Sequence, residues 1–171
     1  NPPVDPGVLA HLSLISAQYK LGKEHACLDL AQRLSPDDPS LALTRALLTH
    51  GEGKHEEALR SIQSAADRAD QSRAKAWKLA VCRFLDATDP ATALKNWIEL
   101  ADANPEDLQV QLAAIGSRSA VSDLEFVDRA GQRAARLSGT DAQRPTITGR
   151  VARARAILAS KVTGPRRDEA V

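Results

Sequence analysis

The residues best suited to chemistry in this 171-residue chain gather around one turn, at residues 51–55. The run Gly-Glu-Gly-Lys-His contains the Gly-Lys pair of a phosphate-binding loop. Such a loop also needs a glycine five residues before that pair and a serine or threonine after the lysine. Leu48 and His55 occupy those two positions, so we interpret the run as a turn between two helices.

The histidines are the other residues that could hold a metal, but none of the four stands four positions from another. A helical metal site uses that i, i+4 spacing. His50 and His55 flank the same turn, where Glu52 or Glu56 could join them in a weak site. Solvated turn histidines are the simpler interpretation. We therefore predict no metal, no cofactor and no catalytic residue, and a protein that is not an enzyme.

Arginine is concentrated in the C-terminal third of the chain. Residues 118–171 carry 11 basic and 6 acidic groups, whereas residues 1–117 carry 12 and 16. Arg129, Arg133 and Arg136 fall at i, i+4 and i+7, which is one face of a helix. A nucleic-acid-binding helical repeat is therefore an alternative function. It is the weaker alternative, because single-strand binders stack bases on aromatic rings and this third has only Phe126.

The composition favours helices as the elements that position these residues. Apolar residues make up 43% of the chain and aromatic residues only 3%, so Leu, Ala, Val and Ile must build the core. No apolar run approaches the roughly 18–20 residues of a membrane helix, so we expect no membrane insertion by this segment. The chain contains no methionine. Because a native chain begins with methionine, we expect this chain to be a soluble segment of a larger protein, cytoplasmic or periplasmic.

The turns between the expected helices follow a repeated pattern. Gly22 and Gly53 each stand between two helical patterns and are followed by acidic residues. Glycine can adopt the left-handed conformation that ends a helix, and acidic side chains suit the N-terminus of the next one. At a third turn, Asp89 can cap a helix in which Pro90 takes the first position.

Four alanines mark the period, since Ala26, Ala58, Ala93 and Ala130 are 32, 35 and 37 residues apart. A period near 34 with two helices per unit is typical of tetratricopeptide repeats. The third unit carries that family's pattern at five positions, which are Trp77, Phe84, Ala93, Trp97 and Pro105. The second unit matches around its turn at Ala46, Gly53, Ala58 and Ile62. The chain therefore resembles the tetratricopeptide repeat family, most strongly over residues 39–107.

This resemblance implies an all-α fold, an α-solenoid forming a right-handed superhelix of antiparallel helix pairs, with about four units and a C-terminal helix. We expect a linker at 1–7, a repeat domain at 8–161 with units near 6–38, 39–70, 74–107 and 105–137 and a final helix at 146–160, and a tail at 162–171. A capping box, Ser122 to Glu125, predicts a helix start. In the final helix Val151, Ala154, Ile157 and Leu158 form one apolar stripe. That helix either caps the array or begins a fifth unit.

In this family the first helix of each pair lines a concave groove that binds peptides or partner domains. Transferring those positions to this chain predicts a partner-binding groove formed by Leu12, Ser16, Tyr19, Leu43, Leu47, His50, Lys75, Lys78, Cys82, Asp86, Gln109 and Leu112. Some members grip acidic chaperone tails, but Cys82 replaces the asparagine that such a clamp needs after Lys78. We therefore do not predict binding of chaperone tails.

The resemblance thus implies a non-enzymatic protein–protein interaction scaffold. Its partner would be a protein or peptide, or another segment of the same parent protein. A structural spacer or assembly region within a larger envelope-associated machine is the other alternative. The sequence does not identify the partner or the oligomeric state.

Overall fold

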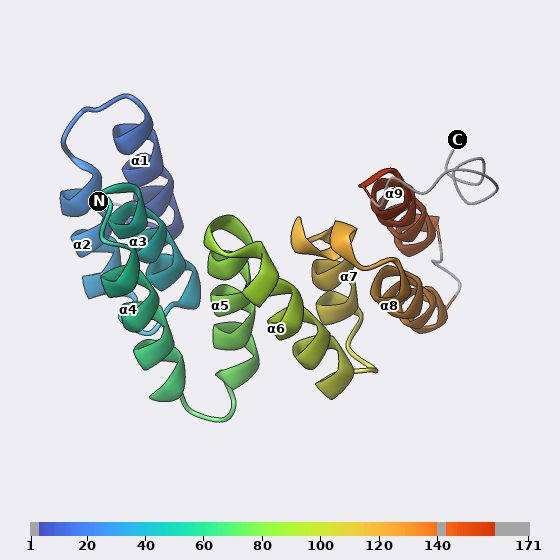
Figure 1. The fold of residues 1–171 in the computed structure, drawn as a ribbon. Coiled ribbons are helices and arrows are strands. Elements are labelled where there is room, and N and C mark those ends of the chain that lie inside the picture. Colours follow the sequence, from blue (N-terminus) through green and yellow to red (C-terminus); the bar gives the residue numbers. More distant parts are fainter. Residues whose placement is uncertain (1–3, 140–142, 160–171) are drawn as a thin grey trace. The chain divides into compact units, whose positions relative to one another are not determined.

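The computed structural model describes residues 4–139 and 143–159 (Figure 1). All regular elements in these two ranges are helical, which confirms the predicted all-α class. The elements are α1 (Pro6–Gln18), α2 (Glu24–Leu34), α3 (Pro39–Gly51), α4 (His55–Asp67), α5 (Ala74–Thr88), α6 (Pro90–Ala103), α7 (Leu108–Gly116), the 3-10 helix η1 (Ser119–Ser122), α8 (Leu124–Leu137) and α9 (Gln143–Ala159). None of the described helices has both the length and the apolar character needed to cross a membrane. The expected tail at 162–171 lies outside the described residues.

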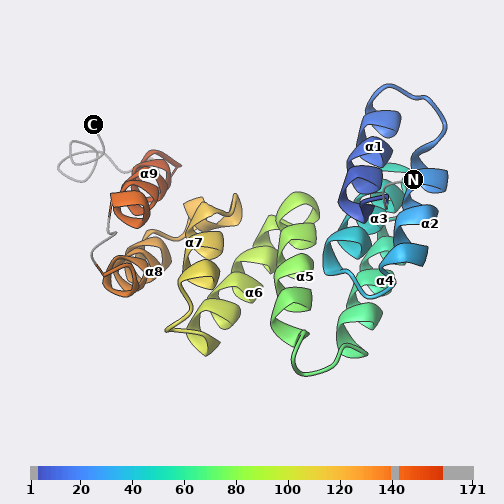
Figure 2. The same cartoon turned by 180° about the vertical axis from the view of Figure 1, so that it is seen from behind.

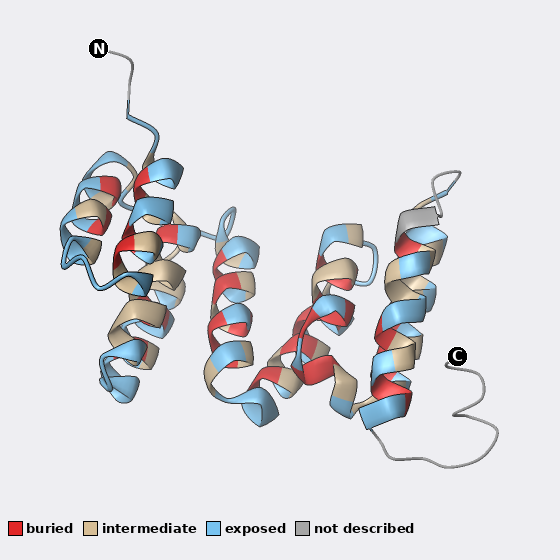
Figure 3. Cartoon of the chain, turned by 90° about the horizontal axis from the view of Figure 1, so that it is seen from above, coloured by how far each residue is buried: buried red, intermediate tan, exposed pale blue. Residues whose placement is uncertain are grey.

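The chain divides into two compact units, Asn1–Phe84 and Leu85–Val171. In the first unit, α1 packs on α2, α3 packs on α4, and α3 contacts both helices of the first pair. Along the helices, buried and exposed residues alternate within successive turns (Figure 3). Leu9, Leu28, Ala31 and Leu41 form a core cluster where these helices meet.

Helix starts and turns in the first unit follow local rules. Asp5 caps α1 by accepting a hydrogen bond from the Gly7 amide at 2.7 Å, and Pro6 takes the first helical turn. Helix α1 therefore begins inside the segment expected to be a linker. Gly22 and Gly53 have φ of 66° and 84°, which confirms the predicted left-handed glycines in both turns.

The repeat register is less regular at the first turn. Ala58, Ala93 and Ala130 are at most 1% exposed to solvent, but Ala26 is exposed. Helix α2 turns Leu28 inward instead. Two residues along a helix correspond to about 200° of rotation, so Ala26 lies on the opposite side from Leu28.

The second unit contains α6 to α9. Asp89 accepts a hydrogen bond from the Thr92 amide and Pro90 starts α6, as the sequence predicted. Trp97 and Phe126 are each 1% exposed and are the largest core side chains of this unit. Asp107 caps α7 through the Val110 amide in the same way that Asp89 caps α6.

The predicted capping box was wrong by one residue. The N-cap of α8 is Asp123, whose carboxylate accepts a hydrogen bond from the Phe126 amide at 2.9 Å. Ser122 instead ends the 3-10 helix that precedes α8. A carboxylate and a hydroxyl cap equally well, so the neighbouring 3-10 turn decided which one serves.

The predicted apolar stripe of the last helix was right at Ile157, which is 1% exposed, but wrong at two other positions. Val151 and Leu158 are 45% and 57% exposed, whereas Ala152 and Ala156 are buried. Helices α8 and α9 lie side by side in both Figures 1 and 2. Two glycines face each other between these helices, since a Cβ added to Gly149 would lie 3.7 Å from the Gly131 Cα. Ala152, Ala156 and Ile157 therefore face inward, whereas Ile147, Val151 and Leu158 face outward.

Candidate protein-interaction surface

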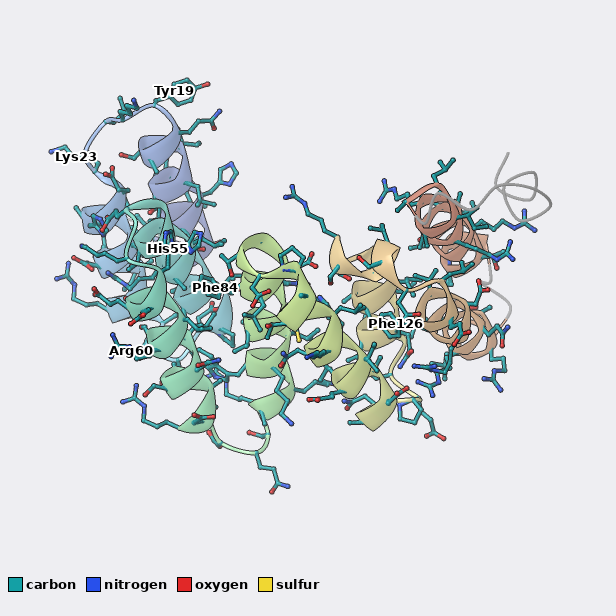
Figure 4. All side chains as sticks on the ribbon, viewed as in Figure 1. Tyr19, Lys23, His55, Arg60, Phe84 and Phe126 are labelled. Atoms are coloured by element: carbon teal, nitrogen blue, oxygen red, sulfur yellow. The ribbon has the colours of Figure 1, made fainter. Side chains whose placement is uncertain are left out.

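On α1, the predicted groove residues fall into two groups. Leu12 and Tyr19 are 45% and 67% exposed, and Tyr19 points away from the helices in Figure 4. Ser16 is only 3% exposed. Its hydroxyl donates to Glu24 Oε2 and accepts from the Lys23 amide, both at 2.9 Å. Ser16 therefore fastens α1 to the following turn and is not available to a partner.

The outward face of α1 continues beyond the residues predicted. Val4 and Val8 are 54% and 55% exposed. Val8 falls with Leu12 and Tyr19 close to one line along the helix. Val4 lies just before α1, ahead of the N-cap Asp5. We call Val4, Val8, Leu12 and Tyr19 the α1 stripe. Val4 was predicted to lie in a linker at 1–7, although Asp5 and the following proline already formed a helix-start signal, and Val8 was not among the residues transferred to the groove.

The opposite face of α1 carries small residues. Ser13 is fully buried, and its hydroxyl donates to the Glu24 carbonyl at 2.8 Å. Hydrogen bonds from Ser16 and from backbone amides favour the charged form of Glu24. They hold the pKa of its carboxyl below the usual value, with the bond at its own backbone the largest contribution. Ser13 and Ser16 of α1 are thus engaged in internal contacts, whereas the α1 stripe meets solvent.

On α3, Leu43, Leu47 and His50 are half-buried. Leu47 lines a cleft of about 410 Å³ together with residues at the ends of α1 and α3 and in the turns after them, which are Ala17, Lys20, Gly22, Glu24, Leu48, Gly51 and Glu52. Of the predicted groove residues on α3, Leu47 therefore lines a cleft. Lysine and carboxylate groups stand around its apolar wall.

Glu52 at this cleft is held by two side chains of the first unit, Lys54 and His25. Its carboxylate lies 2.9 Å from Lys54 Nζ and 2.5 Å from His25 Nε2. The Lys54 hydrogen bond, followed by that of His25, lowers the pKa of the Glu52 carboxyl. The hydrogen bond to Glu52 in turn raises the pKa of Lys54. This cluster ties α2 to the turn between α3 and α4.

The side chain of His50 is partly engaged inside the unit. Its Nδ1 lies 2.9 Å from Nδ1 of His55, and its ring meets the Phe84 ring edge-on with centroids 6.0 Å apart. His55 and Phe84 are labelled in Figure 4. Over the ranges that the structure describes, no three His, Cys, Asp or Glu side chains gather closely enough to hold a metal ion.

On α5, Lys75 and Lys78 are exposed, and Cys82 is 3% exposed. Cys82 therefore cannot contact a partner. Trp77 on the same helix is 5% exposed and belongs to the core. Trp77 also lines a second concavity of about 470 Å³, which the sequence did not predict. The other lining residues are Pro36, Asp37, Ala65, Arg68, Ala69, Asp70 and Arg73.

In the second unit, the predicted groove residues are Asp86, Gln109 and Leu112. Asp86 accepts three hydrogen bonds, from the Arg118 amide at 2.8 Å, the Ser119 amide at 2.9 Å and the Ser119 hydroxyl at 2.7 Å. Its carboxylate therefore joins the end of α5 to the start of η1. Gln109 is exposed and Leu112 is half-buried on α7, so these two remain available.

The predicted arginine face is partly neutralised by carboxylates of the same unit. Arg133 and Arg129 lie 2.6 and 3.6 Å from the carboxylate oxygens of Asp102. Arg129 also lies 6.0 Å from the centre of the Phe126 ring. That ring is 1% exposed, so it cannot stack on a base. These contacts weaken the case for nucleic-acid binding.

No family model, curated protein or solved structure matches this chain. The resemblance to tetratricopeptide repeats therefore depends on the sequence motifs alone.

Proposed function

We propose that this chain is a non-enzymatic scaffold that holds a peptide or a partner domain on the first helices of its repeated helix pairs. The α1 stripe is the observation that supports this proposal. Four large apolar residues along α1 and just before it are 45–67% exposed, although hydrophobic burial is the main driving force for folding. Aligned apolar residues that remain exposed commonly mark a protein-interaction site.

Two further features of the first unit suit such a partner. The half-buried Leu43 and Leu47 add apolar surface on α3, and Lys75 and Lys78 add exposed positive charge on α5. An amphipathic or modestly acidic segment of another protein, or of the same parent protein, fits this mixture. Arrangement of the pairs into a right-handed solenoid, with these residues on its inner side, is part of the proposal.

Site-specific photocrosslinking in cells tests the proposal. A photoreactive residue at position 12 should form a discrete adduct with one partner protein. The same residue at position 34 is the matched control, because Leu34 is also exposed (50%) but lies on α2, outside the stripe. Purification with the Leu12→Asp/Tyr19→Asp variant should lose that partner, and Leu34→Asp should keep it.

The spacer alternative predicts a different outcome. If the helices act only as a spacer or an assembly region, the Leu12→Asp/Tyr19→Asp variant should co-purify with the same proteins as the parent chain. Equal adduct formation at positions 12 and 34, with retention of every associated protein in the Leu12→Asp/Tyr19→Asp variant, would refute the scaffold proposal.

A further inference from the structure

The outer face of α9 carries a narrow line of apolar side chains. Ile147, Val151 and Leu158 are 61%, 45% and 57% exposed, and Ala154 is half-buried between them. We call these four residues the α9 stripe. The opposite face of the helix is already packed, because Ala152 and Ala156 are buried where α9 contacts α7, η1 and α8.

The spacing of the α9 stripe is that of a coiled-coil seam. Its members are 4, 3 and 4 residues apart, which is the alternation of a and d positions in a heptad. At about 100° per residue the four side chains fall within about 60° around the helix. A seam this narrow fits one partner helix laid along α9.

Arginines border the α9 stripe on both sides. Arg150 and Arg155 occupy the positions next to the seam that correspond to g and e of the heptad, and both are exposed. Among the described residues, neither arginine is in an ion pair, whereas Arg153 on another side of α9 lies 2.9 Å from Asp128 Oδ1. The two free charges therefore flank the seam, where coiled coils select their partners.

We infer that the α9 stripe docks an amphipathic helix of another protein whose apolar residues are bordered by carboxylates. The partner's apolar side chains would pack between Ile147, Val151 and Leu158. Its Glu or Asp residues would pair with Arg150 and Arg155. This surface is separate from the α1 stripe and does not depend on the scaffold proposal above.

Charge excludes two nearer occupants of this surface. A second α9 would place Arg150 and Arg155 against the same arginines of the other copy, and like charges at these positions oppose pairing. Residues 160–171 carry three basic and two acidic groups and are interrupted by Gly164 and Pro165. That segment lacks both the acidic excess and the apolar period of a matching helix.

The geometry also favours a protein helix over a membrane surface. Helices that lie on membranes have a broad apolar face and a polar face rich in lysine and arginine on the opposite side. In α9 the apolar line is narrow, and the side opposite to it consists of small residues packed against neighbouring helices. The experiment below therefore distinguishes binding to a protein helix from binding to a lipid surface.

The test uses two labelled synthetic helical peptides with leucine at every a and d position. One has glutamate at all e and g positions and the other has lysine. Fluorescence anisotropy with the full chain should show at least about tenfold tighter binding of the glutamate peptide, since charge pairs beside a seam set partner choice. Arg150→Glu/Arg155→Glu should reverse this preference.

Two further variants separate the stripe from general effects. Val151→Asp should lose both peptides while keeping the helical circular dichroism spectrum of the parent chain. Arg136→Glu is the matched control, because Arg136 is an exposed arginine on α8 outside the stripe, and it should keep the preference for the glutamate peptide.

Three results would overturn the inference. The first is absence of binding to the glutamate peptide, and the second is a preference that survives the double charge reversal unchanged. The third is binding to vesicles of phosphatidylserine and phosphatidylcholine, lost in Val151→Asp, with no binding to either peptide. That last result would assign the stripe to a membrane surface.

Discussion

Replacing Asp86 by alanine tests whether this residue holds the second unit together or contacts a partner. Sequence resemblance placed Asp86 in the groove, but its carboxylate accepts three hydrogen bonds from Arg118 and Ser119. The change removes all three bonds at once. The two donors of Ser119 belong to a residue that is 1% exposed, so water cannot readily replace the lost acceptor.

The expected cost is about 2–4 kcal/mol in the free energy of unfolding. Leaving a buried donor unsatisfied costs about 1–3 kcal/mol. The Ser119 hydroxyl can turn toward the Ser117 hydroxyl 3.4 Å away, which reduces its share. The Arg118 amide belongs to an exposed residue, so water replaces much of that bond. Asp86→Asn should cost less than the alanine change, because its amide oxygen can still accept from Ser119.

Urea unfolding followed by far-ultraviolet circular dichroism measures the total effect, and amide hydrogen exchange at residues 118 and 119 locates it. Exchange at those two amides should be faster in Asp86→Ala. The control is Glu99→Ala, which removes an exposed carboxylate from α6 and should change stability by less than about 0.5 kcal/mol. If both alanine variants are equally stable and the two amides keep their protection, the structural role assigned to Asp86 is wrong.

Two further predictions concern the turn between α3 and α4. Gly53→Ala should lower the free energy of unfolding by about 1 kcal/mol, because Gly53 has φ of 84°. Gly51→Ala at the end of α3 is the control and should be tolerated, because a Cβ added there would meet nothing within 4 Å. An equal loss of stability from both changes in thermal unfolding would contradict this prediction. The pKa of Glu52 is lowered first by Lys54, so the stability it contributes is present above the unfolded carboxyl's pKa and is lost as pH falls through the lower folded value. The melting temperature of Glu52→Gln should therefore lie below that of the parent chain at pH 7 and converge with it toward pH 3, and a gap that persists at pH 3 would argue against the ion pair.

Local sequence signals were sufficient for the all-helical class and for several of the turns and helix starts. The left-handed turns at Gly22 and Gly53 and the start of α6 at Asp89 were confirmed because glycine conformation and N-capping depend on a few neighbouring residues. The same logic applied to Asp5 would have found the start of α1. At Ser122 and Asp123 two capping residues stood side by side, and local preference alone could not choose between them.

Contacts between residues distant in sequence were beyond those signals. Asp86 looked like a groove residue by position, but its hydrogen bonds reach residues 32 and 33 positions away. Cys82 and Ser16 stood at expected groove positions too, and both are buried. Helical period shows which residues share a face, but the packing of other helices determines whether that face is buried.

The sequence by itself determined that this protein is all-helical, the left-handed turns at Gly22 and Gly53, and the start of α6. Those properties depend on hydrogen bonds and preferences within a few residues. Only the tertiary structure decided which faces of α1 and α9 meet solvent. In both helices small residues are buried where neighbouring helices approach, at Ser13 and Ser16 in α1 and at Ala152 and Ala156 in α9. Leu9 and Ile157 share those buried faces, and the remaining large apolar residues of the two helices face outward as two candidate docking surfaces.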